Sequence, residues 1–242
     1  MARKKKKIIS TKNNPRITIC TPTYNRRDFI PGLIKCVDSQ TYPKELIEWL
    51  IVDDGSDPVG DLFEGIDYVR YIRLHKKMKL GQKRNLLNKE ASGEIIVYMD
   101  DDDFYPPDRI IHAVNKLRIS PALIAGSSAM HVYFKDIDQI YKLGPYNKYH
   151  ATAGTFAFKK ELLNITSYED SAEFAEERYF LKDYTIPLVQ LEPKSTILVF
   201  SHKKNTYDKK NLIGGPNVYE TKLSPEAFIK DNELLSFYLD KC

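Results

Sequence analysis

The chain has 242 residues, of which 42% are hydrophobic and 29% are charged, a composition typical of a globular protein. No apolar run reaches the roughly 18 residues that span a bilayer, and the basic N-terminus lacks the apolar segment of a secretory signal, so we expect a cytoplasmic protein. The cysteines Cys20, Cys36 and Cys242 form no C-x-x-C pair, which argues against a disulfide framework and a structural zinc site.

The net charge of +4 is distributed unevenly along the chain. Residues 1–12 contain six lysines and arginines and no acid, so the rest of the chain is slightly acidic. We therefore predict a basic flexible tail over residues 1–14 and do not expect a nucleic-acid-binding protein. The alternative is that the tail is an electrostatic anchor that touches an anionic membrane. Deleting residues 1–12 and measuring activity in solution separates these interpretations.

The first half alternates strand and helix signals. In chain order they predict a strand at 16–20, a helix at 29–37 capped by Asp28, strands at 48–52 and 68–74, a helix at 81–91, a strand at 94–99 and a helix at 108–118 capped by Asp108. This alternation is typical of a parallel sheet with helices on both faces.

The second half is less regular. It contains a predicted helix near 172–182 and apolar runs at 186–191 and 196–200. Because no repeat, low-complexity linker or change of composition interrupts the chain after the tail, we predict one domain over residues 15–242.

Three polar segments, at 21–26, 53–57 and 100–103, follow predicted strands. Ligands of open parallel sheets bind beyond the carboxyl ends of the strands, so the fold should bring all three segments to one edge. Segment 53–57 taken alone is equally typical of an ordinary Asx turn. Its position beside a second acidic segment favours a site.

Four consecutive aspartates occupy 100–103, directly after a fully apolar strand. Neighbouring carboxylates repel each other, and a hard divalent cation with oxygen ligands relieves that repulsion. The alternative is a turn of capping and solvated acids ahead of Pro106 and Pro107, but capping explains one aspartate and not four. The run therefore predicts a site for Mn²⁺ or Mg²⁺, between which carboxylates do not discriminate.

Together these segments resemble the family 2 glycosyltransferases of GT-A fold. The motifs that carry the resemblance over residues 15–118 are TPTYNR at 21–26, DDGSD at 53–57, GQKRN at 81–85, SGEII at 92–96 and DDDD at 100–103. A weaker match continues through GT at 154–155, AEER at 175–178 and His202. The chain is also similar to short glycosyltransferases of large DNA viruses, in which case it would lie in the host cytoplasm or the virion.

The resemblance implies an α/β fold. It would be a single GT-A (Rossmann-like) domain with a mostly parallel central sheet flanked by helices and a less regular acceptor-side C-terminal half. Residues 15–118 would be the nucleotide-sugar-binding half and 119–242 the acceptor-binding half. The implied activity is metal-dependent, inverting, non-processive transfer of a sugar from a nucleotide sugar, with a UDP-sugar favoured, to a hydroxyl of a glycan or another acceptor.

The resemblance also implies roles for the donor-site residues. Tyr24 and the backbone around Thr21 would line the uracil pocket, and Asp54 would accept a hydrogen bond from uracil N3–H. Arg84 would face the base or the diphosphate. The aspartates of the acidic run would have different roles. Asp100 would contact the ribose, Asp102 would bind the metal on the diphosphate, and Asp101 could share either role.

Two further residues of the second half take roles from the resemblance. The general base of the family is usually the second acid of a Glu-Asp pair, a position that Glu177 occupies here after Glu176. The extra methylene displaces its carboxylate by about 1 Å, so an exposed helix-surface acid is the alternative. His202 follows the last predicted strand and would bind the metal. A packed or surface histidine is the alternative.

Two other classes of protein fit the acidic segments less well. A sugar-nucleotide nucleotidyltransferase would need a glycine-rich phosphate loop, and segment 21–26 has no glycine. A non-catalytic nucleotide-sugar-binding relative stays possible because Glu replaces the usual Asp at position 177. The Gln-x-x-Arg-Trp motif of processive members is absent, since Glu48 precedes the single Trp49. Tyr141, Tyr146 and Tyr149 are interpreted as packing residues, with stacking on a sugar acceptor as the alternative.

Overall fold

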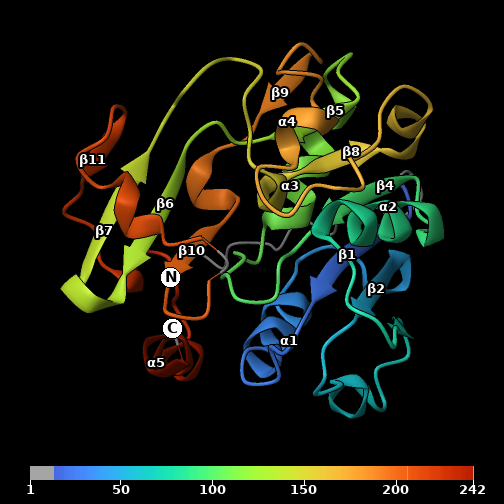
Figure 1. The fold of residues 1–242 in the computed structure, drawn as a ribbon, viewed down its shortest axis with the longest axis horizontal. Helices are drawn as coiled ribbons and strands as arrows, with labels where there is room; N and C mark the ends of the chain where they lie inside the picture. Colours follow the sequence, from blue (N-terminus) through green and yellow to red (C-terminus); the bar gives the residue numbers. More distant parts are fainter. Residues whose placement is uncertain (1–13, 206, 242) are drawn as a thin grey trace, which may run out of the picture.

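A computed structural model describes residues 14–205 and 207–241, so the predicted tail at 1–14 lies almost wholly outside the described residues. Its centre is a seven-stranded sheet with the strand order β3-β2-β1-β4-β8-β5-β9 (Figure 1). The strands are β1 (Ile17–Thr23), β2 (Ile47–Asp53), β3 (Val69–Arg73), β4 (Ile95–Tyr98), β5 (Ile124–Gly126), β8 (Ala157–Lys159) and β9 (Leu188–Gln190). Only β8 runs antiparallel to its neighbours β4 and β5.

Helices cover both faces of this sheet. They are α1 (Ile30–Asp38), α2 (Leu80–Glu90) and α3 (Arg109–Arg118). Side chains alternate along a strand, so Ile17 and Ile19 of β1 share a hydrophobic core with α1 and α3, whereas Cys20 shares a second core with α2. The predicted mostly parallel α/β sheet, flanked by helices, is therefore confirmed.

A second sheet lies beside the first and is not evident from the sequence patterns (Figure 1). Its order is β10-β6-β7-β11, with β10 and β6 parallel and the other pairs antiparallel. The strands are β6 (Met130–Phe134), β7 (Gln139–Leu143), β10 (Leu198–Ser201) and β11 (Val218–Glu220). The C-terminal helix α5 (Asn232–Lys241) packs against α1, where Tyr238 contacts Cys36.

Three helix predictions are wrong in detail. Asp108 stands at the N-cap position of α3, but its side chain makes no capping hydrogen bond. Asp28 does not cap α1, because its carboxylate instead binds Lys204 Nζ at 2.8 Å. The predicted helix near 172–182 shrinks to the four residues of α4 (Glu177–Phe180). Ala175 has a left-handed φ of 52°, which ends any helix begun earlier, and the preceding loop packs on α2 through Gly81 N–H and Ala172 O at 3.0 Å.

Candidate functional site

The acidic run 100–103 leaves β4 at the edge where β1 and β2 also end. A backbone bridge between Phe104 and Leu198 attaches it to β10 of the second sheet. Asp103 strengthens this attachment by accepting a hydrogen bond from Phe200 N–H at 3.1 Å, which makes it a structural residue. The residue after β10, His202, is thereby held beside the acidic run.

Asp102 and His202, the two predicted metal ligands, face each other across this junction. His202 Nε2 lies 3.2 Å from Asp102 Oδ2, and the amide of Asn205 approaches the same oxygen at 3.2 Å. The imidazole stacks on Phe29 at 4.8 Å, and its Nδ1 accepts a hydrogen bond from Lys204 N–H. Packing and hydrogen bonding therefore hold the Nε2 edge of the ring toward the carboxylate.

The surroundings of Asp101 and Asp102 shift the pKa values of these two carboxyl groups in opposite directions. Burial, followed by the neighbouring Asp102, raises the pKa of Asp101 to about 8. Burial would also raise the pKa of Asp102, but the hydrogen bond from His202 and the positive charges of Lys209 and Arg26 outweigh it and hold that pKa at about 2. The guanidinium of Arg26 lies 3.7 Å from both carboxylates.

The Asp102 and His202 pair fits a divalent metal. Within residues 14–205 and 207–241, no group of three or more His, Cys, Asp or Glu side chains forms a complete protein cage. Octahedral ligands about 2.1 Å from Mg²⁺ and at right angles are about 3 Å apart, close to the observed separation of Asp102 Oδ2 and His202 Nε2. Because such ions usually take one or two protein ligands together with substrate phosphates, a pair suffices.

Asp54 lies at the end of β2 in a fully buried ion pair with Lys83 of α2. Lys83 also donates to Thr23 O at 3.0 Å, and Asp54 Oδ2 accepts from Met78 N–H at 2.6 Å. Tyr24 lies beside this group at the surface, with Lys83 Nζ 5.8 Å from the centre of its ring. The predicted base-binding residues Tyr24 and Asp54 are therefore neighbours.

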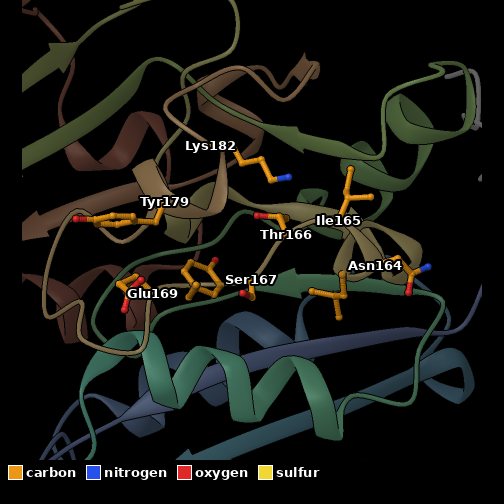
Figure 2. A pocket seen from close by; sticks show the side chains of 9 residues that line it. Asn164, Ile165, Thr166, Ser167, Glu169, Tyr179 and Lys182 are labelled. Carbon is orange, nitrogen blue, oxygen red and sulfur yellow. The ribbon is translucent and has the colours of Figure 1, made fainter.

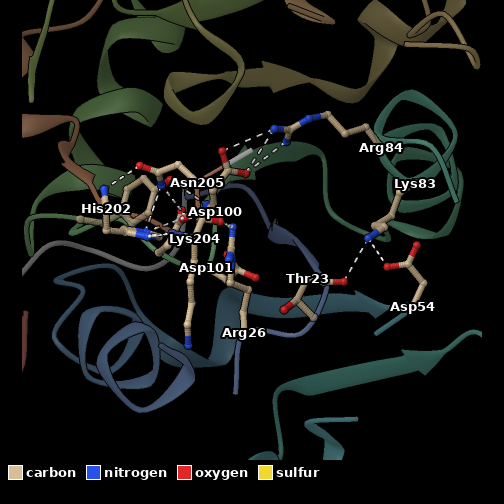
Figure 3. Close-up of polar contacts among 12 residues, drawn as sticks. Thr23, Arg26, Asp54, Lys83, Arg84, Asp100, Asp101, His202, Lys204 and Asn205 are labelled. Carbon is tan, nitrogen blue, oxygen red and sulfur yellow. Dashed lines mark hydrogen bonds and ion pairs between the residues drawn. The ribbon is translucent and has the colours of Figure 1, made fainter. Parts of the chain in front are cut away.

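Arg84 links the donor side to the loop that carries Glu177. Its Nε binds Glu176 Oε1 at 2.7 Å, and its other nitrogens lie 3.3–3.4 Å from Asp100. The guanidinium also stacks over the ring of Tyr98 at 4.6 Å, and the residue is only 3% exposed. Arg84 thus meets Asp100, as Figure 3 shows, and its position suits orienting two acids.

Glu177, the predicted base, is the first residue of α4 and is half-buried. Burial, and then the adjacent charge of Glu176, raises its pKa to about 7. Since Arg84 binds Glu176, the two neighbouring glutamates differ in role: one is an ion-pair partner and the other keeps a carboxylate suited to proton transfer near neutral pH.

Thr21 differs from the other predicted donor residues because its side chain points into the core. It is fully buried in β1, donates to Met99 O at 2.8 Å and accepts from Trp49 Nε1 at 3.0 Å. Only its backbone is left to contact a ligand.

Replacing Thr21 by Val should destabilise the fold and spare nucleotide binding. The substitution leaves the Trp49 N–H and the Met99 carbonyl unpaired in the core, which costs about 1–3 kcal/mol. Urea unfolding measures the loss, and the rise in melting temperature on adding UDP measures binding. A stable variant that no longer responds to UDP would instead make the hydroxyl part of the donor site.

Sequence reasoning missed three polar residues of this edge: Arg26, Lys83 and Asn205. Two of them, Arg26 and Lys83, are basic residues inside the motifs TPTYNR and GQKRN, and the sequence indicated no partner for either. Asn205 had no signal, because only the attachment of β10 to the acidic run brings it to Asp102.

A separate pocket of about 450 Å³ lies beside α4 (Figure 2). The ring of Tyr168, one of its lining residues, is 5.9 Å from the Arg84 guanidinium. It is lined by Leu163, Asn164, Ile165, Thr166, Ser167, Tyr168, Glu169, Tyr179 and Lys182. None of the predicted site residues lines it, although it shares α4 with Glu177.

Among the helices of the described residues, none is long and apolar enough to cross a membrane.

The sequence matches the family model described as "Glycosyl transferase family 2" over residues 18–171. The match includes every predicted donor residue and extends through the acidic run. The chain therefore belongs to glycosyl transferase family 2, and it carries the glycosyltransferase domain that defines the family.

Similar proteins agree with this assignment. The poly(ribitol-phosphate) beta-N-acetylglucosaminyltransferase TarS of Staphylococcus aureus is 22% identical over 239 residues, 91% of this chain and 40% of the relative. The solved structure of TarS 1–349 in complex with UDP-GlcNAc has a TM-score of 0.61 at 18% identity and covers 92% of this chain and 66% of that one. The mannosyltransferase PcManGT of Pyrobaculum calidifontis, in complex with GDP-Man and Mn²⁺, has a TM-score of 0.64 at 17% identity and covers 80% and 59%.

At 17–18% identity, the similarity to the solved structures shows a shared fold. The chain spans about two fifths of the length of the curated relatives TuaG of Bacillus subtilis and TarS. The similarity to viral glycosyltransferases stays a prediction.

Proposed function

We propose that this protein transfers a sugar from a nucleotide sugar, with a UDP-sugar favoured, to a hydroxyl of a carbohydrate or other acceptor, in one displacement that inverts the anomeric configuration. The observation that carries the proposal is the pairing of Asp102 with His202 at the sheet edge where Asp54, Tyr24 and the end of β1 also lie. Structural neighbours bound to UDP-GlcNAc and to GDP-Man and Mn²⁺ support a nucleotide-sugar donor.

In this mechanism Asp102 and His202 hold a divalent metal, Mn²⁺ or Mg²⁺, which when bound neutralises charge on the diphosphate. Tyr24 stacks on the base while Asp54 accepts from its N–H, with Lys83 holding the carboxylate in place. Asp100, oriented by Arg84, accepts a hydrogen bond from a ribose hydroxyl. Arg26 faces the same acidic run and adds positive charge beside the departing diphosphate.

Glu177 acts as the general base. Its carboxylate takes the proton of the acceptor hydroxyl while that oxygen forms a bond to the anomeric carbon. The bond from the anomeric carbon to the diphosphate oxygen breaks at the same time, and the diphosphate leaves with the electron pair. Arg84 serves as a positioning residue, because it binds Glu176 and Asp100 and so fixes the base-bearing loop against the donor.

A donor panel tests the proposal. UDP-glucose, UDP-galactose, UDP-GlcNAc and GDP-mannose are incubated with the protein and Mn²⁺, and the release of nucleoside diphosphate is measured with and without methyl glycosides as acceptors. We expect UDP release from one UDP-sugar, faster with an acceptor. Release of GDP alone would change the donor, and tight nucleotide binding without any turnover would favour the non-catalytic relative.

A further inference from the structure

Three aromatic side chains form a continuous ring cluster outside the donor site, which we call the aromatic shelf: Tyr146, His150 and Tyr184. The ring centroids of Tyr146 and His150 are 4.7 Å apart, and those of His150 and Tyr184 are 4.9 Å apart. Tyr146 is 41% exposed, while the other two rings are half-buried. Tyr184 also packs against the second hydrophobic core, so the cluster rests on that core with the Tyr146 ring open to solvent.

The backbone of the shelf is held by specific hydrogen bonds. Gln190 of β9 donates from Nε2 to the carbonyls of Lys148 and His150, at 3.0 Å each. Tyr146 N–H donates to Ser128 Oγ at 2.8 Å. A segment that crosses from β7 back to the central sheet is thereby fixed in place (Figure 1). Such fixed backbone suits a binding surface better than a freely moving loop does.

The shelf is close in the chain to the elements that carry the proposed base and that contact the proposed ribose-binding acid. Tyr184 follows α4 closely, and the charge of Glu177 contributes to the raised pKa of its phenol after burial. On the other side, the chain runs from His150 to Gly154, where an added Cβ would lie 2.9 Å from Asp100 Oδ2. A molecule resting on the shelf would thus have one end near the Glu177 carboxylate and the donor sugar.

Resting on the proposed glycosyltransferase function, we infer that the aromatic shelf binds the acceptor and that the acceptor is a pyranose-containing carbohydrate. A pyranose has an apolar face of C–H groups that packs on aromatic rings, whereas its hydroxyls need polar neighbours at the rim. An open-chain polyol has no such flat apolar face.

The test compares methyl β-glucopyranoside, methyl β-galactopyranoside and methyl N-acetyl-β-glucosaminide with ribitol, using saturation-transfer NMR on the whole chain. We expect the ring C–H protons of at least one pyranoside, and not ribitol, to receive saturation from the protein. Tyr184→Ala should weaken that binding by about three- to tenfold, the range for loss of an aromatic pair. Tyr184→Phe keeps the ring and should bind as the wild type does. Tyr219→Ala removes an exposed aromatic ring on β11, outside the shelf, and should have no effect.

The donor site is measured separately, by the change in melting temperature with UDP and Mn²⁺ in each variant. An unchanged UDP response together with lost pyranoside binding in Tyr184→Ala supports the shelf. The inference is overturned if no pyranoside binds, if ribitol binds equally well, or if Tyr184→Ala retains wild-type pyranoside binding. A wild type that does not respond to any nucleotide contradicts the proposed function instead, whatever the pyranosides do.

Discussion

Replacing Glu177 by Gln should lower the rate of sugar transfer by about 10²–10⁴-fold, the usual contribution of a general base. Gln is nearly the same size, so it keeps the packing at the start of α4 but cannot take the proton of the acceptor hydroxyl. Binding of UDP should be unchanged, because the donor residues lie on other elements. Steady-state transfer rates and UDP-induced melting shifts measure the two effects.

The control for this substitution is Glu173→Gln, in the same loop. Glu173 is exposed and lies 3.5 Å from Lys79, away from Arg84 and Asp100. Its neutralisation should leave the rate within about twofold of the wild type, as expected for an exposed ion pair of small energetic value. Normal transfer by Glu177→Gln, or equal losses in both variants, would refute the assignment of the base.

The raised pKa of Glu177 also predicts how activity depends on pH. Burial and Glu176 raise that pKa to about 7, so below this pH an increasing fraction of the base is protonated and inactive. We expect kcat/KM to fall about tenfold per pH unit below about 7 in the wild type, as for any single required carboxylate. The residual activity of Glu177→Gln should lack this acidic limb. An acidic limb that persists in the variant would mean that another group controls it.

The raised pKa of Glu177 also affects stability, in the direction opposite to its effect on activity: activity rises with pH and stability falls. Since the folded-state pKa of Glu177 is higher than its unfolded value, the folded chain holds the proton more tightly. Stability is therefore lost as pH rises from about 4.5 through about 7. Glu177→Gln should accordingly melt at the same temperature as the wild type or higher at pH 8, so a loss of activity in the variant would not reflect unfolding.

The first half of the fold could be predicted because its signals are local. Short apolar runs ended by polar segments, such as the one before the four aspartates, marked β1 to β4 and the edge where their ends meet. The strand pairings of the second half depend on contacts between distant residues, such as β10 with β6 or β8 with β4, and no periodicity specifies those. This is why the hairpin over 130–143 was missed.

For the site, too, the sequence indicated which residues matter but not which residues they contact. Motifs pointed to Asp54 and Asp102, which follow strands that end at one edge of the sheet, and to Glu177 on α4, but not to what each would touch. The buried Lys83 beside Asp54 and the binding of Arg84 to Glu176 arise from how α2 packs against the sheet and the 163–176 loop. Neither hydrophobic spacing nor the resemblance specifies the partner of a buried cation.

Asp102→Ala should abolish the stabilisation that UDP and Mn²⁺ give together. In the wild type, a ligand at 100 times its dissociation constant adds about 2.7 kcal/mol, which for a chain of this size raises the melting temperature by roughly 5–10 °C. Removing Asp102 takes away the carboxylate that faces His202, so we expect no metal-dependent rise. The comparison uses the rise on adding ligand, because the loss of the Arg26 and His202 contacts also changes the unliganded melting temperature.

Asp67→Ala, on the exposed loop before β3, is the matched control and should keep the full rise. GDP, dTDP and CDP in parallel identify the base. A larger rise with GDP would support the metal pair but identify a guanosine diphosphate sugar as the donor. Asp54 and Lys83 would then lie beside guanine in place of uracil. A UDP response that is equal with and without Mn²⁺, and equal in Asp102→Ala, would mean that the diphosphate is neutralised by Arg26 and the neighbouring lysines alone, and the proposed metal site would be wrong.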